Sequence, residues 1–162
     1  MKKKIMTMLM LLVLSLSACG GDTEADEKDR YYEILDANGE TLYTIADDGS
    51  VAEIDNLING VTSGEGTLAD GEAPEALYTY VCWQETTLLA GEGPEQERDM
   101  IEILRLEVPE SGNQVLLRVL KEGTDVLAEA VPQLDLGDLL MFSYDVDADT
   151  LAALRDPAQI AE

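Results

Sequence analysis

The chain has no histidine, few basic residues and only two cysteines, and each scarcity excludes a class of chemistry. Histidine is the commonest general base near neutral pH and the usual protein ligand of zinc and copper, so sites built on it are excluded. Ten basic residues stand against 34 acidic ones, which gives a formal net charge of −24. Such a field repels nucleic-acid phosphates and attracts cations, cationic peptides and basic proteins. We therefore expect no nucleic-acid partner, although the charge also suits a surface that only has to stay soluble.

No hydrophobic run in the sequence is long enough to span a bilayer. The longest, residues 5–16, has about a dozen residues, whereas a transmembrane helix needs roughly 20. Three lysines precede it and small residues follow it, which is the pattern of an export leader. Because the lysines stay on the cytoplasmic side, the remainder of the chain is directed outward.

The end of this leader reads Leu16-Ser17-Ala18-Cys19 and resembles the lipobox of bacterial lipoproteins. The resemblance implies a diacylglyceryl group on Cys19, cleavage after Ala18, and Cys19 as the new N-terminus. Two or more acyl chains anchor a protein stably, so we expect a lipid-anchored protein on the extracytoplasmic face of the cell membrane. The alternative is ordinary secretion with an unmodified Cys19.

This interpretation divides the chain into three parts: a signal peptide at 1–18, a lipidated cysteine with a flexible acidic tether at 19–29, and a single α+β domain at 30–162. The tether is polar and cannot bury enough surface to fold. Without the leader, 7 basic and 34 acidic residues remain, a formal charge of −27. Cys82 is then the only free thiol, so the domain must fold without an internal disulfide.

The first half of the domain predicts a hairpin, a helix and a long strand. Residues 30–36 and 40–46 favour strands, and Asn38-Gly39 between them is a strong turn sequence. Residues 50–59 favour an amphipathic helix, with a capping box from Ser50 to Glu53 and Gly60 as its end. A mobile acidic loop is expected at 61–74, followed by a strand at 75–87.

The strand at 75–87 alternates in a way that separates its side chains between two faces. One face would carry Tyr78, Tyr80 and Cys82. The other would carry Leu77, Thr79, Val81 and Trp83.

Further strands are predicted at 98–108, 113–121, 124–131 and 139–146, with a short helix at 150–155 ended by Pro157. The order of elements predicts an α+β fold, a single twisted antiparallel sheet of about six or seven strands with one or two short helices on one face. The ββα opening and the strand from Tyr78 to Trp83 resemble small uncharacterised surface lipoproteins of bacteria. The resemblance also rests on Tyr32-Glu33-Ile34, Asn38-Gly39 and the helix at Ser50, and it carries no settled activity.

Asp145, Asp147 and Asp149 resemble the start of a calcium-binding loop, with Asp156 at the twelfth position. Thr150 stands where such a loop needs glycine, and Pro157 interrupts the expected exit helix. The alternative is that Asp147 or Asp149 caps the last helix.

Two further groups have a functional and a structural interpretation. Tyr78, Tyr80 and Trp83, with Tyr31, Tyr32 and Tyr43, could form a platform for sugars or peptides, or simply pack in the sheet. Glu102 interrupts an apolar strand face, either as a carboxyl group with a raised pKa or at a strand edge that reaches solvent. Cys82, without a histidine, is expected to be a buried apolar side chain.

The sequence therefore predicts a non-enzymatic, monomeric accessory lipoprotein with no catalytic residues and no cofactor beyond the lipid on Cys19. Its partner would be an envelope protein, a cationic peptide or another envelope component. Two alternatives stay open: a carboxylate-based glycan hydrolase, which needs two carboxylates about 5–10 Å apart, and a calcium-binding module.

Overall fold

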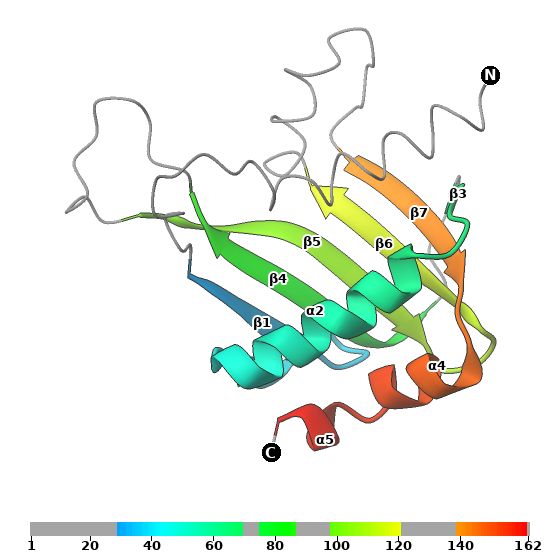
Figure 1. The fold of residues 1–162 in the computed structure, drawn as a ribbon, viewed down its shortest axis with the longest axis horizontal. Coiled ribbons are helices and arrows are strands. Elements are labelled where there is room, and N and C mark those ends of the chain that lie inside the picture. The colour runs from blue at the N-terminus through cyan, green and yellow to red at the C-terminus, as the bar shows by residue number, and fades with distance from the viewer. Residues whose placement is uncertain (1–28, 70–74, 87–97, 121–138, 162) are drawn as a thin grey trace, which may run out of the picture.

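The structure is a computed structural model that describes residues 29–69, 75–86, 98–120 and 139–161. The leader, Cys19, the tether up to residue 28 and the strand predicted at 124–131 lie outside the described residues. Seven strands form one open sheet in the order β2-β1-β4-β5-β6-β7-β3, with antiparallel neighbours throughout (Figure 1). The strands are β1 (Arg30–Leu35), β2 (Thr41–Ile45), β3 (Thr67–Leu68), β4 (Ala76–Glu85), β5 (Met100–Pro109), β6 (Gln114–Leu120) and β7 (Leu139–Asp145).

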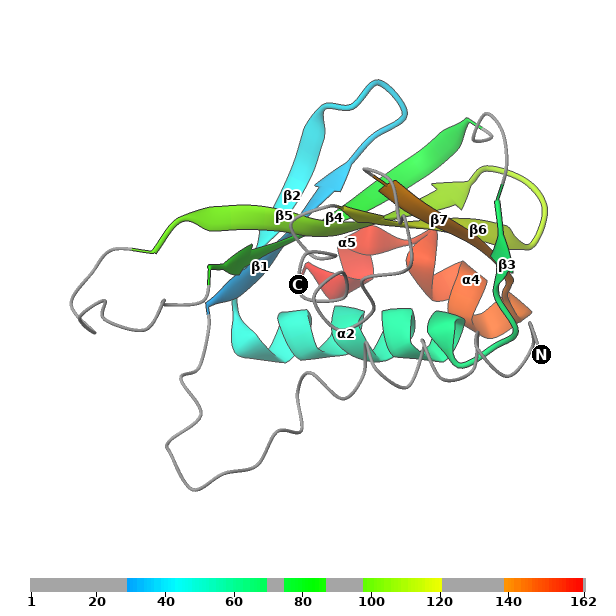
Figure 2. The same cartoon turned by 90° about the horizontal axis from the view of Figure 1, so that it is seen from above.

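Three helices, α2 (Asp48–Thr62), α4 (Ala148–Leu154) and α5 (Pro157–Ile160), lie on the same side of the sheet (Figure 2). The predicted α+β class with one antiparallel sheet is confirmed, with three helices where one or two were expected. None of the helices in the described part of the chain is long and apolar enough to cross a membrane.

The predicted hairpin is present between β1 and β2. Gly39 has a φ of 81°, a left-handed conformation that favours glycine. The Asp36 carboxylate accepts the backbone N–H groups of Asn38 and Glu40, both at 2.8 Å, and so closes the turn. A local turn sequence is sufficient to define this part of the fold.

Helix α2 differs at both ends from the prediction. It begins at Asp48, and its N-cap is Asp47, whose carboxylate accepts the backbone N–H of Ser50 at 2.9 Å. Ser50 is therefore inside the first turn and is not the cap. The helix also continues through Gly60, because the next residue, Val61, is buried in the core and its burial stabilises the extra turn.

The last helical segment also extends beyond the prediction. Helix α4 begins at Ala148, and Pro157 starts the short helix α5 rather than only ending the chain's helical part. Proline suits a first helical turn because the N–H that it lacks would have no partner there. The Tyr80 hydroxyl on β4 donates to the Leu154 carbonyl at 2.9 Å and ties α4 to the sheet.

Part of the predicted mobile loop at 61–74 is ordered structure. Its first two residues belong to α2, and Thr67 and Leu68 form β3, which pairs with Ser143 and Phe142 of β7. Helix α2 contacts both β1 and β7, so it crosses the sheet from one side to the other (Figure 1).

The core fills the space between the helices and one face of the sheet, which we call the inner face. The buried residues include side chains of strands β1, β2, β4, β5, β6 and β7 and of all three helices: Tyr32, Ile34, Ile45, Ile54, Ile58, Val61, Tyr80, Cys82, Leu106, Val108, Val115, Leu117, Tyr144, Leu151, Leu154 and Ile160. The opposite face, which no described helix covers, is called the outer face.

Candidate ligand-binding face

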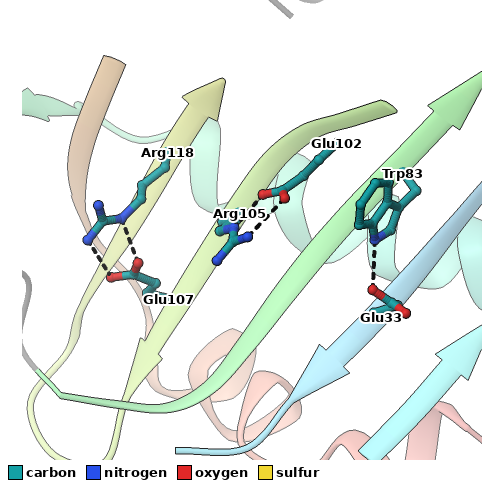
Figure 3. A network of polar contacts seen from close by, with 6 residues as sticks. All are labelled: Glu33, Trp83, Glu102, Arg105, Glu107 and Arg118. Carbon is teal, nitrogen blue, oxygen red and sulfur yellow. Dashed lines mark hydrogen bonds and ion pairs between the residues drawn. The ribbon is translucent and has the colours of Figure 1, made fainter. Parts of the chain in front are cut away.

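The outer face carries a row of polar and aromatic side chains on four adjacent strands of the sheet. Figure 3 shows six of them in front of the sheet with the helices behind: Glu33, Trp83, Glu102, Arg105, Glu107 and Arg118. They come from β1, β4, β5 and β6, so four separate segments of the sequence contribute to one surface.

The strand register explains why these side chains share a face. Residues directly opposite each other in an antiparallel sheet point the same way. Glu33 lies opposite Val81, Val81 opposite Arg105, and Arg105 opposite Arg118. Val81 is only 2% exposed yet lies outside the main core cluster, which fits a place on the outer face between Glu33 and Arg105.

Two arginines on this face lie directly opposite each other, and each is held by a carboxylate. Arg105 forms a two-point ion pair with Glu102, including an Nη2–Oε2 distance of 2.9 Å. Arg118 Nε lies 2.5 Å from Glu107 Oε1. Like charges in directly opposite positions would repel, so the two glutamates make this arrangement possible. The hydrogen bond to Glu102 raises the pKa of the Arg105 guanidinium.

Glu102 does not reach solvent at a strand edge, and that prediction was wrong. Strand β5 is central in the sheet, between β4 and β6. The register shifts between Cys82 and Trp83, so that Trp83 lies opposite Glu102 and one residue of β5 has no opposite residue on β4. This bulge moves Glu102 from the expected core face to the outer face, where Arg105 meets it.

Trp83 is fixed in place by two contacts with β1. Its Nε1 donates a hydrogen bond to Glu33 Oε2 at 2.8 Å. Its ring stacks on that of Tyr31, with centroids 6.0 Å apart and planes 10° apart. Burial and the nearby Glu33 carboxylate raise the pKa of the Tyr31 hydroxyl. The indole orientation is therefore set within the domain.

The structure separates the aromatic residues that the sequence grouped together. The predicted alternation of β4 is confirmed: Tyr80 is buried on the inner face, and Tyr78 packs against the core there. Trp83 lies on the outer face with Tyr31 alone of the other candidates. Tyr32 is buried, and Tyr43 packs against the core. A pair of rings, and not a six-residue platform, is what the outer face presents.

The candidate calcium ligands lie around the start of α4. The Asp147 carboxylate accepts the backbone N–H groups of Asp149 and Thr150 at 3.1 and 3.0 Å, and these bonds lower its pKa. Asp147 is thus the N-cap of α4, which was the alternative to calcium binding. In the described ranges, no three carboxylate or cysteine side chains are grouped to hold a metal ion. Calcium binding at Asp145, Asp147 and Asp149 stays a prediction.

A polar network also lies at the end of the inner face, beneath α2. The Tyr32 hydroxyl and Arg30 Nη1 donate to the Asp55 carboxylate at 2.5 and 2.9 Å. Arg30 Nη2 donates to Gln84 Oε1 at 2.9 Å. Cys82 beside this network is fully buried, and burial raises the pKa of its thiol to about 11. The network attaches α2 to β1 and β4, and Cys82 packs as the apolar side chain that the sequence predicted.

Sequence reasoning placed Tyr31 with Trp83 only as one of six candidate aromatic residues. It missed Glu33 as a partner of Trp83 and did not single out Arg105 or Arg118. The sequence held one indication of this contact. Tyr31 and Glu33 are two residues apart in β1, and Val81 and Trp83 are two residues apart in β4, so each pair points to one face of its strand. Comparison with known proteins gives no match to a protein family, to a curated protein or to a solved structure.

Proposed function

We propose that this chain is a lipid-anchored extracytoplasmic protein whose α+β domain binds a cationic peptide or protein segment and performs no catalysis. The lipobox-like sequence at Cys19 supports the anchor, and the charge of −27 after the leader supports a cationic partner.

The observation that carries the proposal is how the domain uses its arginines. Each arginine of the described ranges is bonded within the domain. Four pair with carboxylates, as Arg30–Asp55, Arg98–Glu85, Arg105–Glu102 and Arg118–Glu107. Arg155 donates to the carbonyl oxygens of Pro109 and Gly112.

The carboxylates in these pairs are all part-buried, so the exposed acidic residues are a separate set. Those in the described ranges are Asp29, Glu40, Asp47, Asp48, Glu53, Glu65, Glu75, Asp99, Glu110, Asp145, Asp147, Asp149 and Asp156. Internal ion pairs therefore leave the negative surface unneutralised, and a cationic partner would find a favourable field over much of it.

The anchor is tested by expressing the full chain in a bacterium with the variant Cys19→Ala beside it. We expect the wild type to enter the detergent-rich phase and to show the mass of an acylated N-terminal cysteine, because the acyl chains hold it in the membrane. The variant should be recovered in the aqueous phase. A wild type with an unacylated start would contradict the anchor.

Binding is tested by calorimetry on the full-length protein in neutral detergent. The probes are a short peptide of alternating arginine and serine and a matched peptide of alternating glutamate and serine. We expect the cationic peptide alone to bind, with its affinity falling at least about tenfold from low to high salt, because exposed charges are screened. Equal or absent binding of both peptides would contradict the proposed function.

A further inference from the structure

Glu33 differs from the other two carboxylates on the outer face that Figure 3 shows. Glu102 and Glu107 are each paired with an arginine (Figure 3). Glu33 accepts a neutral N–H from Trp83, at its Oε2 atom, and among the described residues it has no cationic partner. One carboxylate oxygen and one full negative charge are therefore left for an external donor.

The two rings beside Glu33 offer the surface that a cation prefers. The face of an indole or phenol ring carries negative charge density, which attracts ammonium and guanidinium groups. The Glu33 hydrogen bond and the Tyr31 contact hold the Trp83 ring in one orientation, so little side-chain entropy is lost when a ligand stacks on it. Both rings are only part-buried.

The charges around this position do not oppose a cation. Arg105, the cationic side chain drawn nearest to Trp83, is neutralised by Glu102. Glu33 therefore contributes an excess negative charge at the ring pair, within a chain whose formal net charge is −24.

We propose that Glu33, Trp83 and Tyr31 are the recognition point for a lysine or arginine side chain of the cationic partner. The ammonium or guanidinium group would donate to the free Glu33 oxygen while its stem lies on the aromatic pair. This inference rests on the proposed function, since it names where the basic segment binds. It explains why the carboxylate is paired with an indole N–H: that bond orients it and leaves its charge uncompensated.

The experiment uses the fact that Trp83 is the only tryptophan of the chain. Tryptophan emission of the full-length protein in neutral detergent is followed while the arginine–serine peptide is added. We expect the emission to change in intensity or wavelength with the same midpoint as the calorimetric titration. A calorimetric signal with unchanged emission would overturn the inference and leave the proposed function standing.

Two matched variants locate the charge that matters. Glu33→Gln keeps an oxygen for the Trp83 N–H but removes the negative charge, and we expect it to weaken peptide binding about five- to thirtyfold. Glu40→Gln removes one charge from the exposed hairpin turn and should weaken binding less than about threefold. Equal losses in both variants would mean that the overall field alone attracts the peptide, which overturns the inference. No binding by the wild type would overturn the inference and the proposed function together.

Discussion

Gly66 lies against the ring of Tyr144, and no larger residue fits there. A Cβ atom at Gly66 would lie 2.5 Å from the nearest ring carbon of Tyr144, and Tyr144 is buried in the core. We expect Gly66→Ala to lower the free energy of unfolding by about 1–3 kcal/mol, because the ring or the backbone must move. Urea denaturation with a fluorescence readout measures this.

Gly60 provides the control for that substitution. It is an exposed position within α2, and nothing lies within 4 Å of a Cβ built there. Gly60→Ala should leave stability unchanged or raise it by up to about 1 kcal/mol, because alanine favours the helix. If both variants lost the same stability, the contact between Gly66 and Tyr144 would not be the cause.

Cys82 should react only when the domain unfolds. Its side chain is fully buried and its thiol has a pKa of about 11, against an ordinary value of 9.0. A pKa that is two units higher corresponds to about a hundredfold less thiolate at a given pH, so alkylation of the folded protein should be at least about a hundredfold slower than in urea.

Mass spectrometry after alkylation in urea also counts the free thiols of the chain. One label is expected if Cys19 is acylated, and two labels would contradict the anchor.

At the level of elements, a buried hydrogen bond joins α4 to the sheet. Tyr80→Phe removes the hydroxyl that donates to the Leu154 carbonyl and leaves that buried acceptor unsatisfied. We expect a loss of about 1–3 kcal/mol in the free energy of unfolding. Tyr78→Phe on the same strand face is the control, and its loss should be clearly smaller.

The two ends of α2 show what local sequence can and cannot predict. The helix itself was predictable from the spacing of Val51, Ile54 and Ile58. Its first residue was not, because Ser50 and Asp47 both suit an N-cap and only the structure assigns the role to Asp47. Asp47→Ala should therefore lower the urea midpoint more than Ser50→Ala does. A larger loss in Ser50→Ala than in Asp47→Ala would instead support the capping box predicted at Ser50.

Elements that depend on a distant partner were the ones missed. Thr67 and Leu68 have no strand pattern of their own and form β3 only because β7 pairs with them. The outer-face position of Glu102 depends on a bulge in β5 opposite β4, which cannot be predicted from either strand alone.

The hairpin and the alternation of β4 were predictable because each depends only on residues within one short stretch of the sequence. The contact of Trp83 with Tyr31 and Glu33 needs the register of two strands about 50 residues apart, and sequence patterns do not give it.

For the whole molecule, stability should fall in alkali. Burial raises the pKa of Cys82 from 9.0 to about 11 and that of Tyr144 from 10.0 to about 12. Both groups release their protons more readily in the unfolded chain. Their contribution is therefore complete below about pH 9 and is lost as the pH rises through 11 and 12. Each group can remove up to about 1.4 kcal/mol per pH unit within its own window.

Urea midpoints measured from neutral pH upward check this expectation. The midpoint should be nearly constant up to about pH 9 and then decline, and the decline should be shallower in Cys82→Ala. A midpoint that stayed constant to pH 11 would contradict the burial of these groups.

The path of α2 across the sheet has a consequence for the order in which the domain can be completed. The chain leaves β2 at one edge, crosses beneath the sheet as α2, and arrives at β3 on the far edge, where its partner β7 is the last strand to be synthesised. Until Leu139–Asp145 has been made, β3 has nothing to pair with and α2 has only part of its contact surface. Completion of the sheet therefore has to wait for the C-terminal quarter of the chain, and a topology with such distant strand pairing slows folding.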